Sequence, residues 1–411
     1  MEVKKRLDKR IDRLIIILIL GGLAAIGPLN TDMYLPAFPM IKGDLDTTAS
    51  LVQLSLTAGL LGLAFGQVIA GPLSDIHGRR KLLLISLSLF TVISILCALA
   101  PSIELFIFLR IIQGLTGGAG IVISRACVRD LYSGSEMTKI FSILVLIMGI
   151  APILAPVVGG TLLQFVTWRG IFITLSGLGA MMLLAIAFRF PETLPKEKRI
   201  ISGFQQTAIS LRKLAGDHLF LGYALAMGLS YGAMFAYISG SPFVLQEIYQ
   251  VSPQLFSVMF GINAIGLVVA SQVTGRLAGR IGENRFITIG LVTLFTGGIL
   301  LLSFTLMETG LLSILFAFFL VVSSAGFIGP SCTSLAMSGQ SSNAGSASAF
   351  LGVISFGIGG MVSPLVGMFG TQTALPLGIV VAVCSVSAVV VYLVIIRKST
   401  LSIKHQTGVG Q

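Results

Sequence analysis

Twelve apolar stretches, each long enough to cross a lipid bilayer, recur along these 411 residues. A helical crossing needs roughly 20 apolar residues. Because a bilayer leaves no backbone group unpaired, the stretches are predicted to be helices. The strands of a membrane barrel would alternate polar and apolar residues instead, which argues against that fold. The predicted spans are 14–36, 49–72, 82–100, 104–126, 139–164, 168–190, 218–240, 253–275, 286–306, 310–331, 344–370 and 374–396.

The basic residues are sorted between the gaps that separate these stretches. Of 27 Lys and Arg residues, 24 lie in every second gap or in the tails, whereas the alternate gaps hold only Lys42 and Arg169. Basic loops resist translocation across the membrane, so the basic side is predicted to be cytoplasmic. An even number of crossings then places both termini in the cytoplasm.

Several classes of function do not fit the sequence. The net charge of +11 comes from clusters at membrane edges, which topology and anionic lipid explain, so no nucleic-acid partner is expected. Four cysteines and three histidines are scattered without ligand spacing, so neither a metal site nor a cofactor is expected. No nucleotide-binding or hydrolase motif appears. We therefore expect a protein that is not an enzyme.

The spans divide into two groups of six. The long gap 191–216, with two prolines and a charge run, is predicted to be a cytoplasmic linker between an N-terminal bundle (1–190) and a C-terminal bundle (217–411). The expected fold is therefore an all-α integral membrane protein of twelve transmembrane helices in two pseudo-symmetric six-helix bundles.

Internal repetition supports this division. The segment Gly71–Lys81 is echoed 204 residues later by Gly275–Arg285, with glycine, leucine and a final basic residue in common. A second echo relates Ala155–Gly159 to Ser363–Gly367. Duplicated six-helix halves are typical of a transporter that rocks about a central site.

Arg110 is the one basic residue inside an apolar stretch, about six residues into the fourth span. Burying a cation in hydrocarbon costs at least roughly 2.5–3.5 kcal/mol, so such an arginine is a functional candidate. Helical spacing places small and polar residues near its face, as expected of a cavity wall. An arginine whose side chain extends to the outer interface is the alternative. The small and polar residues on or near the face of Arg110 are Gln113, Gly114, Gly117, Ile121 and Ser124.

Asp32, near the outer end of the first span, is the predicted partner of Arg110. Both residues lie at a similar depth from the outer side, which permits an ion pair. A carboxylate under the opposing influences of burial and a nearby cation could take or release a proton, so Asp32 and Arg110 are the proton-coupling candidates. Alternatively, Asp32 caps a helix broken between Pro28 and Pro36. Asp44, in the following gap, is interpreted as merely solvated.

The segment after the second span is a candidate cytoplasmic gating loop, formed by Gly71, Asp75, Gly78, Arg79 and Arg80. The glycines allow a tight reversal, and the acid can pair locally with the basic residues or lie at a helix N-terminus. An ordinary basic loop that only fixes the topology remains the alternative.

The fifth span contains Gly149, Pro152, Pro156, Gly159 and Gly160. Prolines remove backbone donors and bend a helix, and glycines allow a neighbour to pack closely. These five residues are predicted to form a hinge, and a static kink is the alternative.

Polar residues within other spans are candidates for lining a substrate cavity, although each is also an ordinary packing or interfacial residue. The candidates are Tyr34, Gln53, Gln113, Tyr231, Tyr237 and Asn263.

Several of these motifs resemble the major facilitator superfamily. Gly71–Arg80 resembles its signature loop between the second and third helices, and Arg110–Gly114 resembles its fourth-helix arginine motif. Gly149–Gly160 is similar to the fifth-helix motif of drug antiporters. Four further motifs resemble the bicyclomycin-resistance (Bcr/CflA) group of that superfamily: Thr31–Pro39, Val128–Asp130, Pro152–Pro156 and Trp168–Phe172.

The resemblance implies a proton-coupled multidrug exporter of the bacterial inner membrane that functions as a monomer. Its partners would be protons, the bilayer and amphiphilic drugs such as bicyclomycin, chloramphenicol-type compounds or sulfonamides. Asp32 would be the acid for which proton and drug compete, Arg110 would couple protonation to the cavity, and Asp75 and Arg79 would latch the cytoplasmic ends. The chain departs from the pattern at Ile76, Ala155 and Gly279, of which the first weakens the charge relay and the last leaves the latch one-sided.

Three rival functions stay open at this point. The same fold could export or import a native metabolite. A channel is disfavoured by the duplicated halves and the proline-rich fifth span. An integral-membrane enzyme would need clustered acids, histidines or cysteines within the spans, and the sequence shows none.

Overall fold

The computed structural model describes residues 10–195, 197, 199, 214–338, 344–368, 370 and 372–397, and every regular element in those ranges is a helix. The predicted linker 191–216 lies largely outside the described residues. The chain divides into two compact units, one of residues 1–202 with 252–261 and one of residues 203–251 with 262–411. The predicted domain boundaries stay a prediction.

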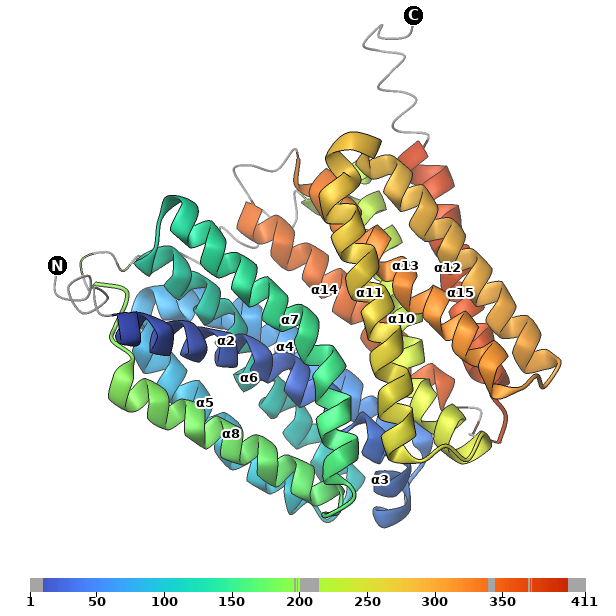
Figure 1. The fold of residues 1–411 in the computed structure, drawn as a ribbon, viewed down its shortest axis with the longest axis horizontal. Coiled ribbons are helices and arrows are strands. Elements are labelled where there is room, and N and C mark those ends of the chain that lie inside the picture. Colours follow the sequence, from blue (N-terminus) through green and yellow to red (C-terminus); the bar gives the residue numbers. More distant parts are fainter. Residues whose placement is uncertain are drawn as a thin grey trace, which may run out of the picture. The chain divides into compact units, whose positions relative to one another are not determined.

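The first six spans form the helices α2 to α8 (Figure 1). In chain order they are α2 (Arg10–Asp32), a 3-10 turn η1 (Leu35–Ala37), α3 (Phe38–Asp44), α4 (Ala49–His77), α5 (Arg79–Ala98), α6 (Ile103–Leu131), α7 (Gly134–Leu162) and α8 (Trp168–Arg189).

The remaining spans form α10 to α15. They are α10 (His218–Phe243), the π-helical turn η3 (Val244–Ile248), α11 (Pro253–Ile281), α12 (Glu283–Leu306), α13 (Leu311–Met337), α14 (Ala344–Val362), the 3-10 turn η5 (Ser363–Val366), α15 (Leu375–Val391) and the π-helical turn η6 (Tyr392–Arg397).

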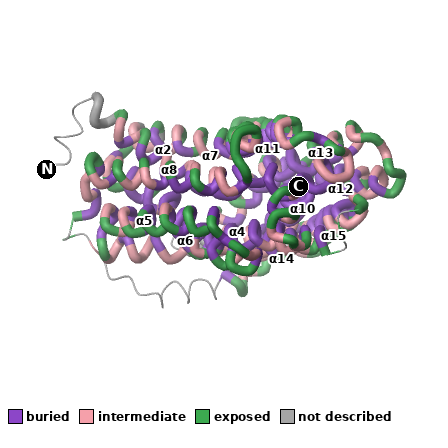
Figure 2. Tube along the Cα trace, turned by 90° about the horizontal axis from the view of Figure 1, so that it is seen from below, coloured by how far each residue is buried: buried purple, intermediate pink, exposed green. Residues whose placement is uncertain are grey.

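The predicted membrane fold is confirmed. Among the described residues, eleven helices are long and apolar enough to cross a membrane, and Phe350–Val366 is a shorter apolar helix at the position of the remaining span. Exposed and buried stretches alternate along the helices (Figure 2), and many exposed side chains are large and apolar. Such surfaces are unusual on soluble proteins and are suited to contact with lipid.

Small residues bring helices into backbone contact in both units. A Cβ atom at Gly118 of α6 would overlap the carbonyl oxygen of Leu63 on α4. A Cβ atom at Gly326 of α13 would overlap the carbonyl oxygen of Leu267 on α11, which is 204 residues after Leu63. Glycine permits this close approach in membrane helix pairs. The two units therefore repeat one helix crossing.

The first span differs from the expectation of a helix over 14–36. Helix α2 passes through Pro28, ends at Asp32, and gives way to η1 and α3, so the apolar segment extends to Asp44. Met33 and Tyr34, which form the break, are fully buried. Non-helical backbone at membrane depth is tolerated where protein covers it.

The predicted gating loop at 71–81 is wrong as a loop, because most of it is helical. Helix α4 continues to His77, α5 begins at Arg79, and Gly78 alone connects them with φ 96°. Gly282 connects α11 to α12 in the same way with φ 95°. Only glycine adopts such a conformation without a steric penalty, so one residue suffices to reverse the chain.

Candidate functional site

Arg110 lies fully buried in α6 and holds the end of α2. Its Nη1 donates to Asn30 Oδ1 at 2.7 Å and to Gln113 Oε1 at 2.6 Å. Its Nη2 donates to the backbone oxygen of Asn30 at 2.9 Å. The last four carbonyl groups of a helix lack intrahelical donors, and Asn30 carries one of them. The guanidinium therefore supplies a donor that the broken helix needs, and its charge favours that helix end.

The same guanidinium also contacts aromatic rings. Its Cζ lies 4.4 Å from the ring centroid of Tyr34 and 5.6 Å from that of Phe172. A cation over an aromatic face is attracted to it, and more strongly when water is excluded. Gly59 makes room, since a Cβ there would lie 2.9 Å from Nη2. Arg110 is therefore an interior residue, and the interpretation that it extends to the interface is wrong.

The predicted ion pair between Asp32 and Arg110 is not formed. Within the part of the chain that the structure describes, Asp32 has no basic partner within 4.0 Å. The Arg110 guanidinium donates its hydrogen bond to Asn30 instead. Two residues along a helix correspond to about 200° around its axis, so equal depth did not give equal direction. Asp32 is the last residue of α2 and caps neither η1 nor α3, so the capping alternative is also wrong.

Gln113 extends this buried network toward α5. Its Nε2 donates to Ser94 Oγ at 2.8 Å, and Ser94 Oγ donates to the carbonyl oxygen of Phe90 at 2.7 Å. Tyr34 OH lies 3.2 Å from Ser55 Oγ of α4. Gln113, Tyr34 and Gln53 are all buried within the first unit. That these three residues line a substrate cavity stays a prediction.

In the second unit, two of the predicted cavity residues meet. Asn263 Nδ2 donates to Tyr237 OH at 2.9 Å, and the Tyr237 ring centroid lies 4.9 Å from that of Phe318. Tyr231 lies elsewhere on α10, beside Gly329 of α13. Asn263 and Tyr237 thus form a neutral hydrogen-bonded pair in the second unit.

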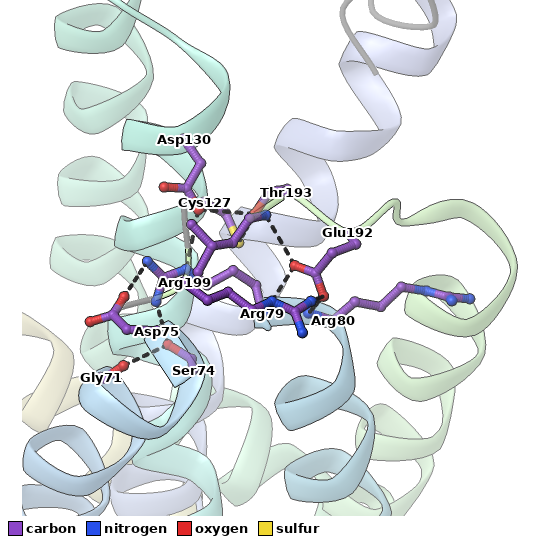
Figure 3. Close-up of polar contacts among 11 residues, drawn as sticks. Gly71, Ser74, Asp75, Arg79, Arg80, Cys127, Asp130, Glu192, Thr193 and Arg199 are labelled. Atoms are coloured by element: carbon purple, nitrogen blue, oxygen red, sulfur yellow. Dashed lines mark hydrogen bonds and ion pairs between the residues drawn. The ribbon is translucent and has the colours of Figure 1, made fainter. Parts of the chain in front are cut away.

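Polar and charged residues gather around Gly78, and we name Ser74, Asp75, Arg79, Asp130 and Glu192 the Gly78 cluster (Figure 3). Arg79 Nη2 lies 2.6 Å from Asp75 Oδ1, and its Nε lies 3.1 Å from Asp130 Oδ2. Its Nη1 donates to Ser74 Oγ, which itself donates to the Gly71 carbonyl oxygen at 2.8 Å. Arg79 therefore joins α4, α5 and α6.

Glu192, just after α8, completes the cluster at the start of α5. It accepts from the backbone N–H of Arg79 at 2.9 Å and from that of Arg80 at 3.3 Å (Figure 3). Carboxylates favour helix N-termini, where these N–H groups lack partners. In return, Arg80 Nη2 donates to the Ala187 carbonyl oxygen of α8 at 2.7 Å. Thr193 Oγ1 donates to Asp130 Oδ2 at 3.1 Å.

Sequence reasoning noted Asp130 only within the motif Val128–Asp130 and gave it no role, and it missed Glu192 and Thr193. A signal existed for Asp130 and Glu192, because both acids lie just after a predicted span, on the side where the basic residues gather. Their distance in sequence from Arg79 hid the connection.

The predicted hinge helix α7 is continuous from Gly134 to Leu162, with Pro152 and Pro156 inside it. A Cβ at Gly159 would overlap the carbonyl oxygen of Met33, so this glycine lets α7 pack against the break after α2. Bending of α7 at Gly149 or Gly160 stays a prediction.

Asp44 is not merely solvated, and that interpretation is wrong. Trp168 Nε1 donates to Asp44 Oδ2 at 2.9 Å, and Arg169 Nη1 forms an ion pair with the same oxygen. The Arg169 Cζ lies 4.4 Å from the Trp168 ring centroid. These contacts connect the end of α3 to the start of α8.

A membrane protein of duplicated helical halves, with ionisable side chains inside its spans, has the features of an integral membrane transporter. Residues 20–364 match the model of the Major Facilitator Superfamily, and the chain belongs to this family. It is a multi-pass membrane transporter and not an enzyme.

Two curated relatives span nearly the whole chain. "Uncharacterized MFS-type transporter YdgK" of Bacillus subtilis is 46% identical, with 91% of this chain and 94% of the relative covered. "Bicyclomycin resistance protein homolog" of Haemophilus influenzae is 31% identical, with 92% and 95% covered. The resemblance to the bicyclomycin-resistance group is thereby confirmed.

Among solved structures, a variant of the nucleoside transporter NupG is similar with a TM-score of 0.77 at 13% identity, covering 92% of this chain and 99% of that one. At this identity the likeness concerns the fold alone.

Proposed function

We propose that this transporter exports amphiphilic drugs in exchange for protons by alternating access, across the bacterial inner membrane and with both termini in the cytoplasm. The relative named as a bicyclomycin resistance protein homolog supports a drug as the substrate. Candidate substrates are bicyclomycin, chloramphenicol-type compounds and sulfonamides, and the proposed functional unit is the monomer.

The observation that carries the proposal is the environment of Asp32. It lies inside the membrane-spanning segment Leu14–Asp44, is 8% exposed, and has no ion pair among the described residues. An unpaired buried carboxylate is costly when ionised, and a bound proton removes that cost. Ionisable groups of this kind within spans serve proton and substrate pathways. Asp32 is therefore our proposed proton carrier.

Arg110 is proposed to couple Asp32 to the surrounding helices. It binds Asn30, two residues before Asp32, and faces Tyr34, two residues after it. A change in the charge of Asp32 alters the electrostatic field at a guanidinium that holds both flanks of the break. The direct salt bridge that the sequence predicted is replaced by these contacts with the flanking residues.

In the proposed cycle, proton and drug compete. In the outward-facing state Asp32 takes a proton and the drug leaves, and in the inward-facing state the proton leaves and the drug binds. Exchange requires each ligand to bind the two states with different affinity. The proposed cavity residues are Tyr34, Gln53, Gln113, Tyr231, Tyr237 and Asn263.

The remaining roles are assigned by position. The Gly78 cluster is proposed to latch the cytoplasmic helix ends, through Asp75 and Arg79 with the neighbouring Gly71, Gly78 and Arg80. Helix α7 is proposed to bend at Gly149, Pro152, Pro156, Gly159 and Gly160.

The test is drug accumulation in cells with and without the protein, repeated after collapse of the pH gradient. We expect Asp32→Asn to abolish proton-driven export while the protein still inserts in the membrane. Asp46→Asn, an exposed acid two residues beyond α3, is the matched control and should export normally. Wild-type export by Asp32→Asn would remove Asp32 from the mechanism, and wild-type export that persists without a proton gradient would overturn proton exchange.

A further inference from the structure

Trp168 is the single tryptophan of the chain, and it lies buried at the start of α8. Its indole N–H donates to Asp44 at 2.9 Å, while the guanidinium of Arg169 covers its ring at 4.4 Å and pairs with the same carboxylate. Asp44 is half-exposed and Trp168 is buried. The Asp44 carboxylate, on the predicted outer side of the membrane, is thereby hydrogen-bonded to the buried indole of Trp168.

From Trp168, ring contacts lead inward without interruption. Its centroid lies 5.5 Å from Phe106 and 6.0 Å from Phe172, both nearly perpendicular. Phe172 lies 5.6 Å from Tyr34, and Phe106 lies 6.4 Å from it. We name Trp168, Phe106, Phe172 and Tyr34 the aromatic column. Perpendicular pairs at these distances are favourable beyond the area they bury.

The aromatic column ends at the break that follows Asp32. Tyr34 is the second residue of the break, and its ring lies under the guanidinium of Arg110. Phe172 contacts the same guanidinium at 5.6 Å. Gly159 packs against Met33 from α7, so the break has little room to move without moving its neighbours. Close-packed interiors transmit such displacements.

We propose that Trp168 is a positioning residue for Arg110 and Asp32, held in place by Asp44 and acting through the aromatic column. The hydrogen bond from Trp168 to Asp44 fixes the depth of the indole, the indole fixes Phe172, and Phe172 with Tyr34 fixes the guanidinium that binds Asn30. The position of α8 is thereby coupled to the group that flanks the proposed proton carrier. The geometric coupling does not depend on the proposed function, whereas its effect on export rests on it.

Intrinsic fluorescence tests the coupling, because Trp168 is the only indole that can emit. In purified protein, we expect Asp32→Asn and Arg110→Lys each to change the emission of Trp168. Asp75→Asn, in the Gly78 cluster, should leave it unchanged. Phe172→Leu should weaken the response to Asp32→Asn while the cooperative thermal transition of the protein persists, because Phe106 still connects Trp168 to Tyr34. Identical emission of wild type, Asp32→Asn and Arg110→Lys would overturn the proposal, whatever the folding state of Phe172→Leu.

Export separates positioning from mere packing. Trp168→Phe retains a ring but removes the N–H, and the loss of one charge-assisted hydrogen bond should lower turnover about tenfold with little change in the KM for drug. Asp44→Asn keeps an acceptor for Trp168 and should have a smaller effect, and Asp46→Asn should have none. Unchanged turnover in Trp168→Phe would contradict the positioning role.

The two proposals fail in different ways. If wild type does not exchange drug for protons but Asp32→Asn still changes the emission of Trp168, the positioning role stands and the proposed function falls. If export depends on protons and Asp32 while the emission never responds, the proposed function stands and the positioning role falls.

Discussion

The two units contain the same close helix crossing, between α4 and α6 in the first and between α11 and α13 in the second, but different buried side chains lie beside it. Arg110 lies eight residues before Gly118 on α6, and Phe318 lies eight residues before Gly326 on α13. Both side chains are fully buried and both face a tyrosine, Arg110 at 4.4 Å from the Tyr34 ring and Phe318 at 4.9 Å from that of Tyr237. One scaffold thus holds a cation in the first unit and an aromatic ring in the second.

The one-residue links at Gly78 and Gly282 repeat this contrast. Arg79 begins α5 and contacts three side chains, whereas Glu283 begins α12 and accepts one hydrogen bond from Ser334 Oγ at 2.5 Å. Gly279, 204 residues after Asp75, occupies the position where the repeat would place a matching aspartate. The duplication therefore preserved backbone geometry, while the ionisable clusters that we describe developed in the first unit. This difference teaches that the backbone places a site and the side chains decide whether it carries charge.

Exchanging the buried residue of one crossing for that of the other should have the largest effect. Arg110→Phe leaves the Asn30 carbonyl and the Gln113 side chain without their donor, and each buried polar group left unsatisfied costs about 1–3 kcal/mol. We expect loss of export and a much lower melting temperature in detergent. Arg110→Lys should keep partial activity, since the ammonium group can still donate hydrogen bonds but lacks the planar geometry of the guanidinium. Wild-type export by Arg110→Phe would show that the guanidinium is not needed, and complete loss of export in Arg110→Lys as well would show that a positive charge alone is not enough.

If the crossing itself is symmetric, alanine should be tolerated equally poorly in both units. Gly118→Ala and Gly326→Ala each place a methyl group against a carbonyl oxygen, and overpacking of this kind costs about 1–3 kcal/mol. Thermal unfolding of the two variants should shift by similar amounts. A shift in one variant alone would mean that the two crossings are not equivalent. Gly275→Ala, which meets no atom within 4 Å, is the control.

The two one-residue links should differ in function. Asp75→Asn removes the charge that pairs with Arg79, and we expect turnover to fall about tenfold, equivalent to 1.4 kcal/mol, with a smaller change in the KM for drug. Glu283→Gln keeps an acceptor for Ser334 and should alter turnover by less than about twofold. Transport rates in proteoliposomes decide the matter, and equal slowing by both substitutions would contradict a one-sided latch.

The smallest effect is expected in the neutral pair. Tyr237→Phe removes the hydrogen bond with Asn263 and leaves the ring against Phe318, so about 1 kcal/mol is lost. If this pair binds drug, the affinity should fall about fivefold at unchanged proton dependence. Drug binding measured at two pH values would show this, and a changed proton dependence would move part of the coupling into the second unit.

Helices and duplication were readable from the sequence because apolar length and repeated glycines are local signals. The 204-residue offset of Gly71–Lys81 reappears as nearly equal φ angles at Gly78 and Gly282, 96° and 95°. Arg110 was identified for the same reason, since a cation in an apolar stretch is visible in the sequence.

The sequence did not show which way a side chain points around its helix, or which residues far apart in the chain come into contact. Equal depth along two helices suggested that Asp32 pairs with Arg110. The rotation of α2 about its axis directs Asn30 toward Arg110 instead. The bond between Glu192 and Arg79 joins residues 113 apart in sequence, and that between Asp44 and Arg169 joins residues 125 apart. No periodicity encodes such contacts, because they follow from how helices pack.

The single-residue connectors have a consequence for motion. Gly78 alone lies between His77 of α4 and Arg79 of α5, so two peptide steps of about 3.8 Å each join the two helices. Gly282 joins α11 to α12 in the same way. With no slack between them, neither helix of a pair can slide or unwind by a turn unless the other follows. Inserting several flexible residues after Gly78 would therefore allow α4 and α5 to move independently.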